Sequence, residues 1–385
     1  MYSSSDYSNG YHNEPHRVGA SHRERARRGV RGGRSRDCRD GFRVSKEQQS
    51  EDEQNVTPCT DFDMAYFHSY AHVGIHEEMI KDRVRTETYR AAIMQHQSFI
   101  EGKVVVDVGC GTGILSIFCA QAGAKRVYAV DASDIAVQAN EVVKANNLSD
   151  KIIVLHGRVE SMLGSVITAR DRWLKRGGVI LPSNATLYMA PITHPDRYSE
   201  SIDFWRNVYG IDMSAMMPLA KQCAFEEPSV ETISGENVLT WPHVVKHVDC
   251  YTIEIHELES VTTRYKFKSM MRAPLHGFAF WFDVEFSGPA MSPINALTNP
   301  PIDGSQSKKR TNPNDALVLS TAPEDPPTHW QQTVIYFYDP IEVEQDQLIE
   351  GSVTLSQSKE NRRFMNIHLE YTSGGRSFVK ESVMR

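Results

Sequence analysis

The pattern of hydrophobic and polar positions divides the chain into three regions. Residues 1–60 contain no periodic run of apolar side chains. Over residues 61–183, short apolar runs typical of buried strands alternate with segments whose apolar positions recur with the period of a helix. Over residues 184–385, strand-like runs separated by turn residues dominate. The pattern predicts an α/β domain followed by a mostly antiparallel β-barrel domain.

The stretch KVVVDVGCGTGILSIFCAQAGA, residues 103–124, joins a strand to a helix through a glycine-rich loop. Gly109, Gly111 and Gly113 let the backbone approach a ligand where a Cβ would intrude. The helix that follows points its free N–H groups and the positive end of its dipole at the loop. This combination predicts a nucleotide-type site.

Two classes of cofactor bind to a strand–loop–helix unit of this kind. A second strand ends in Asp131, at roughly the distance from the loop where doubly wound folds place an acid on ribose hydroxyls. The dinucleotide fingerprint is G-x-G-x-x-G, whereas this loop reads G-x-G-x-G with Ile114 where the third glycine should be. Asp107 would repel a pyrophosphate and suits an ammonium group and a ribose. The residues therefore favour S-adenosyl-L-methionine over NAD.

The composition narrows the class of protein further. The formal net charge of −7 gives no overall attraction to nucleic acid. No apolar run approaches bilayer length and the start of the chain is polar, so we expect neither a membrane span nor a secretory signal. The six cysteines lack paired metal spacing, and HExxH spacing is absent after His76. We therefore expect no metal, reduced thiols, and a location in the nucleus and cytoplasm.

Residues 1–60 form an arginine-rich tail that includes the run RERARRGVRGGRSR. It has too little apolar surface to offset the entropy of ordering, so we expect disorder. The run suits an RNA contact, a nuclear-import signal or a modification substrate, and it is equally typical of a solvated tail without a specific role. Direct binding of nucleic acid is expected at most through this tail.

Residues 61–385 resemble the protein arginine N-methyltransferases. The resemblance rests on AYFHSYAHVGIHEEMIKDRVRTETYR, VVDVGCGTGILSIFCAQAGAKRVYAVDAS, HGRVE, ESMLGSVITARDRWLKRGGVILPS, APLHGFAFWFDVEF and PPTHWQQT. It implies a Rossmann-like class I methyltransferase domain over 61–183, which binds S-adenosyl-L-methionine, and a β-barrel domain over 184–385. It also implies a cis peptide at Leu181-Pro182, between a strand and the second domain.

The resemblance assigns the cofactor contacts by matching position. Arg85 would pair with the cofactor carboxylate, Asp131 would bind the ribose, and the glutamate of HGRVE would reach towards the adenine. The implied cofactor-binding residues are His76, Met79, Arg85, Asp107, Gly109, Asp131 and Glu160. The histidine of the THW loop, His329, would pair with Asp82 and accept a proton. The catalytic candidates are Glu160, His329 and Asp82.

One departure from the family pattern is large. The HGRVE motif runs directly into the helical segment SMLGSVITARDRWLKRGG, with no strand-like run between them. In this gap the family has an apolar fourth strand and a loop, SEWMGY…YES, whose two glutamates hold the substrate guanidinium. Glu160 aligns with the HGRVE glutamate or with the second loop glutamate, and it can fill one role only. A fork-shaped cation held by one carboxylate is held poorly, so we expect impaired catalysis and lower stability.

Two segments of the second domain stand out. Residues 197–222 predict short helices, which are either local core or, as the resemblance favours, an arm that docks on a second copy in a homodimer. Residues 287–314 predict a flexible insertion rich in Pro, Ser and Asn.

The implied reaction moves a methyl group from S-adenosylmethionine to an arginine nitrogen of a histone or an RNA-binding protein, with the asymmetric dimethyl product. A non-catalytic partner that modulates an intact copy is the alternative from another class. An NAD-dependent oxidoreductase is disfavoured by the glycine spacing.

Overall fold

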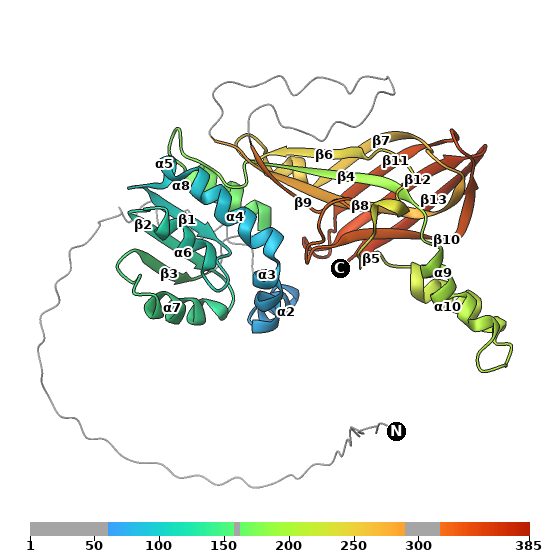
Figure 1. The fold of residues 1–385 in the computed structure, drawn as a ribbon, viewed down its shortest axis with the longest axis horizontal. Helices are drawn as coiled ribbons and strands as arrows, with labels where there is room; N and C mark the ends of the chain where they lie inside the picture. Colours follow the sequence, from blue (N-terminus) through green and yellow to red (C-terminus); the bar gives the residue numbers. More distant parts are fainter. Residues whose placement is uncertain (1–60, 158–161, 289–315) are drawn as a thin grey trace, which may run out of the picture. The chain divides into compact units, whose positions relative to one another are not determined.

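The computed structural model describes residues 61–157, 162–288 and 316–385 (Figure 1). The predicted disordered tail over 1–60, Glu160, and nearly all of the predicted insertion over 287–314 lie outside the described residues.

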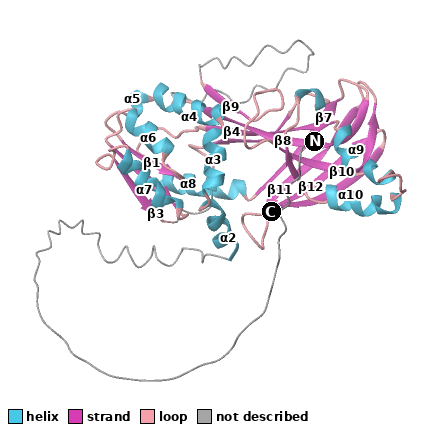
Figure 2. Ribbon diagram, turned by 60° about the horizontal axis from the view of Figure 1, so that its bottom comes forward, coloured by secondary structure: helices cyan, strands magenta, loops and turns pink. Residues whose placement is uncertain are grey.

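The first domain begins with helices and continues with the predicted alternation of strand and helix. The opening helices are α2 (Asp61–Tyr70), α3 (Val73–Lys81), α4 (Arg83–Gln95) and α5 (Gln97–Ile100). The alternation comprises β1 (Val104–Val108), α6 (Ile114–Gln121), β2 (Arg126–Asp131), α7 (Ile135–Ala145), β3 (Ile152–His156) and α8 (Met162–Trp173). In Figure 2, α4 to α8 gather around these strands, whereas the second domain is mostly strand.

The strands of the first domain form a parallel sheet in the order β1-β2-β3. Within the described residues no strand pairs with the other side of β1, which is the side where the family resemblance predicts a fourth strand. On the same strand, Val104 is 58% exposed and Val106 is 36% exposed. Among the described strands, β1 is therefore an edge strand with exposed apolar side chains.

The segment that links the two domains differs from the expectation in one respect. The Leu181-Pro182 peptide is cis, as the resemblance implied. The strand expected just before it is wrong, because residues 178–183 form no strand and the next strand, β4 (Asn184–Ile192), begins after them. A strand forms only where its backbone finds a pairing partner, and none of the described strands pairs with residues 178–183.

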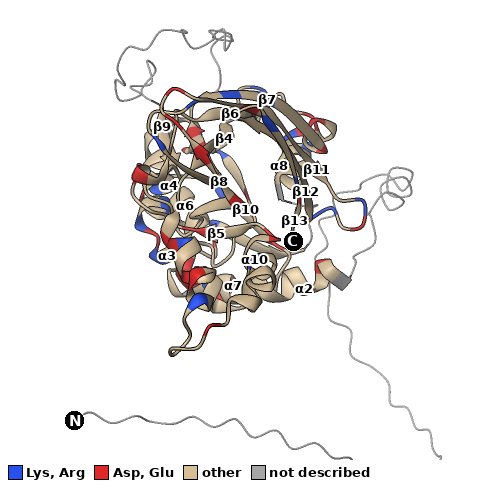
Figure 3. Cartoon of the chain, turned by 90° about the vertical axis from the view of Figure 1, so that its right-hand side faces the viewer, with Lys and Arg blue, Asp and Glu red and all other residues tan. Residues whose placement is uncertain are grey.

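The second domain is barrel-like and consists of two antiparallel sheets. One has the order β5-β10-β8-β4-β6 with β9 paired to β8, and the other has the order β13-β12-β11-β7. The remaining strands are β5 (Ser229–Glu231), β6 (His243–Asp249), β7 (Ser260–Lys268), β8 (Ala273–Phe286), β9 (Leu317–Ser320), β10 (Gln332–Val343), β11 (Leu348–Gln357), β12 (Met365–Ser373) and β13 (Arg376–Met384). Seen from the side, β7, β11, β12 and β13 lie opposite β8 and β10 (Figure 3).

The core of the second domain fills the space between its sheets. Phe278 of β8, Phe337 of β10 and Tyr371 of β12 are buried in one cluster, and the rings of Phe337 and Tyr371 stack at 4.2 Å. Along β7 the residues alternate, so that Tyr265 and Phe267 face the core while the intervening lysines are exposed. This alternation is the pattern of a sheet with one wet and one buried face.

The predicted arm over 197–222 lies within four helices of the second domain. They are α9 (Pro195–Ser201), η2 (Asp203–Arg206), η3 (Ser214–Met216) and α10 (Met217–Phe225). The segment exposes large apolar side chains, namely Phe204, Tyr209, Ile211, Met216 and Leu219. Such a run is unusual on a surface that meets only water.

Substitution of Val104 by Lys tests the exposed edge. A lysine on a strand edge opposes pairing with another chain, so Val104→Lys is expected to slow self-association several-fold. Val137→Lys on α7 is the matched control, because Val137 is 56% exposed but lies on a helix. Light scattering over time at fixed concentration gives the comparison. Equal association rates of the two variants would contradict the proposal that self-association occurs through β1.

Candidate cofactor and active site

The glycine loop after β1 needs its glycines for conformational reasons. Gly109, Gly111 and Gly113 all have positive φ, at 74°, 54° and 85°. The N–H groups of Gly109 and Cys110 donate to the carbonyl of Val130 at 2.8 and 3.0 Å, which fixes the loop to the end of β2. The sequence prediction of a tight loop between β1 and α6 is therefore correct.

Asp131, at the end of β2, shapes this loop from the other side. Its Oδ2 accepts a hydrogen bond from the N–H of Gly111 at 2.8 Å, and its Oδ1 accepts from the N–H and Oγ of Ser133 at 2.9 and 2.7 Å. A carboxylate has about four lone-pair sites, so it retains capacity for a ribose hydroxyl. Ser133 was missed by the sequence reasoning, although its position two residues after an acid signals such a turn.

Asp107, near the end of β1, is held by the helix that follows. Ser116 Oγ donates to Asp107 Oδ2 at 2.7 Å. Burial raises the pKa of Asp107, and the hydrogen bonds from Ser116 oppose that rise. The positive charge of Arg85 also lowers the pKa of Asp107, so this cation lies close enough to Asp107 to interact with it electrostatically.

His76 of α3 packs directly on the glycine loop. Its side chain is buried, and Nε2–H donates to the carbonyl of Tyr70 at 2.7 Å. A Cβ on Gly111 would lie 3.0 Å from His76 Nδ1, so the loop can approach the ring only because residue 111 has no side chain.

Arg85 of α4 carries an unpaired donor. Its Nε is buried and has no hydrogen-bond partner within the described part of the chain, and its Nη1 reaches only the carbonyl of Met79 at 3.4 Å. Its guanidinium lies 5.6 Å from the ring centroid of Tyr89 and 6.0 Å from that of Trp330. A buried donor without a partner is costly, and a carboxylate would satisfy it. Tyr89 and Trp330 were missed, since nothing local in the sequence links them to Arg85.

His329 and Asp82 meet as the resemblance implied. His329 Nδ1–H donates to Asp82 Oδ2 at 2.7 Å, and the backbone N–H of His329 donates to the same oxygen at 2.9 Å. The other oxygen of Asp82 accepts from the N–H of Arg85 at 2.9 Å, so Asp82 also caps α4. The Asp82 side chain is only 4% exposed. The pair thus ties the second domain to the helix that carries Arg85.

The structure therefore gathers the glycine loop, Asp107, Asp131, His76 and Arg85 in one region, with Met79 beside Arg85. It does not place Glu160, which lies outside the described residues. Within the described residues no cluster of three or more His, Cys, Asp or Glu side chains could hold a metal ion. None of the described helices is long and apolar enough to cross a membrane.

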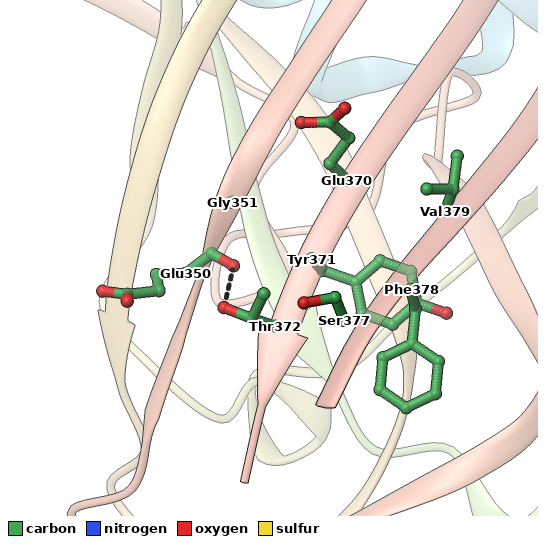
Figure 4. A pocket seen from close by; sticks show the side chains of 8 residues that line it. All are labelled: Glu350, Gly351, Glu370, Tyr371, Thr372, Ser377, Phe378 and Val379. Atoms are coloured by element: carbon green, nitrogen blue, oxygen red, sulfur yellow. Dashed lines mark hydrogen bonds between the residues drawn. The ribbon is translucent and has the colours of Figure 1, made fainter. Parts of the chain in front are cut away.

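A separate pocket of about 270 Å³ lies in the second domain (Figure 4). It is lined by Glu350, Gly351, Glu370, Tyr371, Thr372, Ser377, Phe378 and Val379, all from β11, β12 and β13. Thr372 Oγ1 donates to the carbonyl of Glu350 across it at 3.0 Å. None of these residues belongs to the first domain, so the pocket is not part of the candidate site.

Comparison with known proteins agrees with this geometry. A family model described as "Arginine methyltransferase oligomerization subdomain" matches residues 183–303 and 307–376, and one for the ribosomal protein L11 methyltransferase matches residues 87–169. The chain is 69% identical to the probable protein arginine N-methyltransferase 6 of Arabidopsis thaliana, with 100% of both chains covered. It is 61% identical to the probable protein arginine N-methyltransferase 6.2 of Oryza sativa, with 85% of this chain and 90% of that protein covered. The chain belongs to the protein arginine N-methyltransferases.

Solved structures of the family show the same fold. The Arabidopsis thaliana protein arginine methyltransferase 10 structure has a TM-score of 0.67 at 32% identity, covering 83% of this chain and all of that one. The PRMT1 enzyme–prozyme complex of Trypanosoma brucei with AdoHcy has a TM-score of 0.69 at 30% identity, covering 82% and 100%. The cofactor of this methyltransferase is S-adenosyl-L-methionine. The unpaired Nε of Arg85 and the glycine loop fit its carboxylate and its ribose end respectively.

Substitution of Asp82 by Asn tests the link between the domains. Burial opposes ionisation of Asp82, but hydrogen bonds from Arg85 and His329 hold its pKa below the ordinary value. A depressed carboxyl pKa adds stability above the unfolded pKa of about 3.9, and that stability is lost as the pH falls through the folded pKa. Asp82→Asn is therefore expected to cost about 1–3 kcal/mol at pH 7. Denaturant unfolding of both proteins from pH 7 to pH 3 should show the difference shrinking towards low pH, and a constant difference would refute this account.

Proposed function

We propose that this chain methylates guanidino nitrogens of arginines in histones or RNA-binding proteins, with asymmetric dimethylarginine as the product. The observation that carries the proposal is the buried, unpaired Nε of Arg85 beside the glycine loop and Asp107. The resemblance supports the substrate class and the product, and the Arabidopsis thaliana relative that aligns over its full length is named a probable protein arginine N-methyltransferase.

The chain's own residues suggest how the reaction proceeds. The cofactor supplies a sulfonium methyl group, and the acceptor nitrogen loses a proton. Because Nδ1 of His329 donates to Asp82, a neutral His329 keeps Nε2 as a proton acceptor. Asp82 fixes this tautomer and stabilises the charge that the ring gains, so the pair can take up the released proton. Arg85 and Asp131 position the cofactor, and positioning supplies most of the rate in a direct transfer.

We further propose that turnover is lower than in full-length relatives. The sequence lacks the first glutamate of the substrate loop, and Glu160 can fill either the HGRVE role or that of the second loop glutamate, but not both. The alignment with the Arabidopsis relative spans 435 positions against 385 residues here, so about 50 positions have no counterpart in this chain. The unpaired side of β1 agrees with a loss that includes the fourth strand.

The exposed apolar side chains of residues 197–222 support docking on a second copy. The matching family model is described as an oligomerization subdomain, and it includes this segment. We propose a homodimer held by this arm. We also propose that the protein resides in the nucleus and cytoplasm, and that any contact with nucleic acid is made by the arginine-rich tail.

A second candidate function is that of a non-catalytic partner. The Trypanosoma brucei neighbour is an enzyme–prozyme heterotetramer, in which an enzyme associates with a prozyme. The unpaired side of β1 and the single remaining glutamate favour an analogous role here, in which the chain associates with an intact copy and modulates it. Co-purification with a full-length relative, together with a failure to bind cofactor alone, would support this candidate.

Calorimetric titration with S-adenosylhomocysteine tests the cofactor site. The wild-type chain is expected to bind in the micromolar range, roughly −8 kcal/mol. Arg85→Gln should weaken binding about tenfold or more, because it removes the charge-assisted bonds to the ligand carboxylate. Arg83→Gln is the matched control, since the Arg83 side chain is 83% exposed and pairs only with Glu87 among the contacts observed. Equal effects of the two substitutions would exclude Arg85 as the carboxylate partner.

Radiolabelled methyl transfer to an arginine-rich histone tail tests turnover. The chain is expected to methylate at least tenfold more slowly than a full-length relative, because one carboxylate in place of two costs on the order of 1.4 kcal/mol or more of transition-state binding. Mass spectrometry of the product distinguishes asymmetric from symmetric dimethylarginine. Comparable turnover of the two proteins would overturn the proposed impairment.

A further inference from the structure

The helix α2 is fastened to the second domain by a nearly buried ion pair. Arg363 Nε donates to Asp63 Oδ1 at 2.8 Å, and the two side chains are only 11% and 12% exposed. Arg363 lies in the turn between β11 and β12, 300 positions along the chain from Asp63. Two charges that leave water need close, well-aligned partners, and this pair has the required geometry.

Aromatic rings of α2 surround the same guanidinium. Its central carbon lies 3.8 Å from the ring centroid of Tyr66 and 5.1 Å from that of Phe67. Beside it, the rings of Phe62 and Phe364 meet edge to face at 5.5 Å. A planar guanidinium can stack on a ring and bind a carboxylate at once, which an ammonium group does less well.

The turn that carries Arg363 is itself held in place. The N–H of Arg363 donates to Asn361 Oδ1 at 2.9 Å, and the N–H of Phe364 donates to the carbonyl of Asn361 at the same distance. The N–H of Ser358 donates to the carbonyl of Phe364 at 2.8 Å, and this hydrogen bond closes the turn. Arg363 is therefore presented to α2 from a rigid support.

The same face of α2 leads on to the cofactor loop. Tyr66 and Tyr70 lie with ring centroids 4.7 Å apart, and the carbonyl of Tyr70 accepts the hydrogen bond from His76. His76 in turn packs against Gly111. Tyr66 also lies within the electrostatic reach of Asp131, which adds to the effect of burial in raising the pKa of Tyr66. Each link in this series is a direct contact or a short-range interaction.

We propose that Arg363 is a positioning residue for cofactor binding, because it anchors α2 from the second domain so that Tyr66, Tyr70 and His76 are held against the glycine loop. Arg363 does not touch the cofactor in this proposal and acts through α2. The inference rests on the proposed cofactor site, and it adds a residue from the second domain to the determinants of cofactor affinity.

The test compares S-adenosylhomocysteine affinity in four proteins by calorimetry. Arg363→Gln is expected to raise Kd about tenfold, since a desolvated ion pair and stacked cation together are worth on the order of one decade in an equilibrium constant. Because this variant removes the cationic partner of Asp63, the double variant Asp63→Asn with Arg363→Gln is measured as well. The double variant should recover thermal stability while affinity stays low. Arg362→Gln, the exposed neighbour, should match wild type.

Amide hydrogen exchange over residues 61–70 supplies a readout that does not require ligand. Exchange in α2 should increase in Arg363→Gln and in the double variant, and it should remain at the wild-type level in Arg362→Gln. A wild-type Kd in the double variant, or unchanged exchange in α2, would overturn the proposal. If wild type fails to bind S-adenosylhomocysteine, the proposed cofactor site is wrong and the positioning role falls with it, whereas binding by wild type that Arg363→Gln does not weaken refutes the positioning role alone.

Discussion

The carboxylate of Asp131 is the constraint on which the cofactor half of this protein depends. It accepts from the backbone of Gly111 on one side and from Ser133 on the other, so it joins the loop after β1 to the turn after β2. The loop can take this shape because its glycines adopt positive φ, and His76 can then pack where a side chain on Gly111 would lie. Each feature requires the others, which explains why strand, glycines, helix and acid occur together in the sequence.

The local part of this arrangement could be predicted from the sequence, because all its elements lie within one short stretch. The β1–α6 loop and the terminal acid of β2 follow from residue type and spacing alone. The Asp82–His329 contact could not be derived that way, since 247 positions separate the two residues, and it was anticipated only through family resemblance. The Asp63–Arg363 pair was not anticipated at all, because neither residue belongs to a recognisable motif.

In the second domain, too, the sequence predicts local structure better than contacts between distant segments. Its strand-like runs were visible as alternating patterns, as in β7, but strand pairing is non-local and the division into two sheets was not apparent. The prediction of a strand before Leu181-Pro182 is wrong for a related reason. Its residues are apolar enough, but strand geometry requires a neighbour, and the described sheet ends at β1.

The cofactor half and the proposed substrate half of the active site would depend differently on a strand next to β1. The cofactor half is built from β1, β2 and the helices α3, α4 and α6. The hydrogen bonds of Asp131, Asp107 and His76 form there without a fourth strand. The family resemblance implies that the substrate half depends on two glutamates that follow such a strand, and Glu160 aligns either with the second of them or with the HGRVE glutamate. Under the proposed impairment, cofactor binding and methyl transfer would be separable properties of this chain. Such a chain would bind its cofactor as an enzyme does, and the proposed loss would fall on interactions that are made only in the transition state.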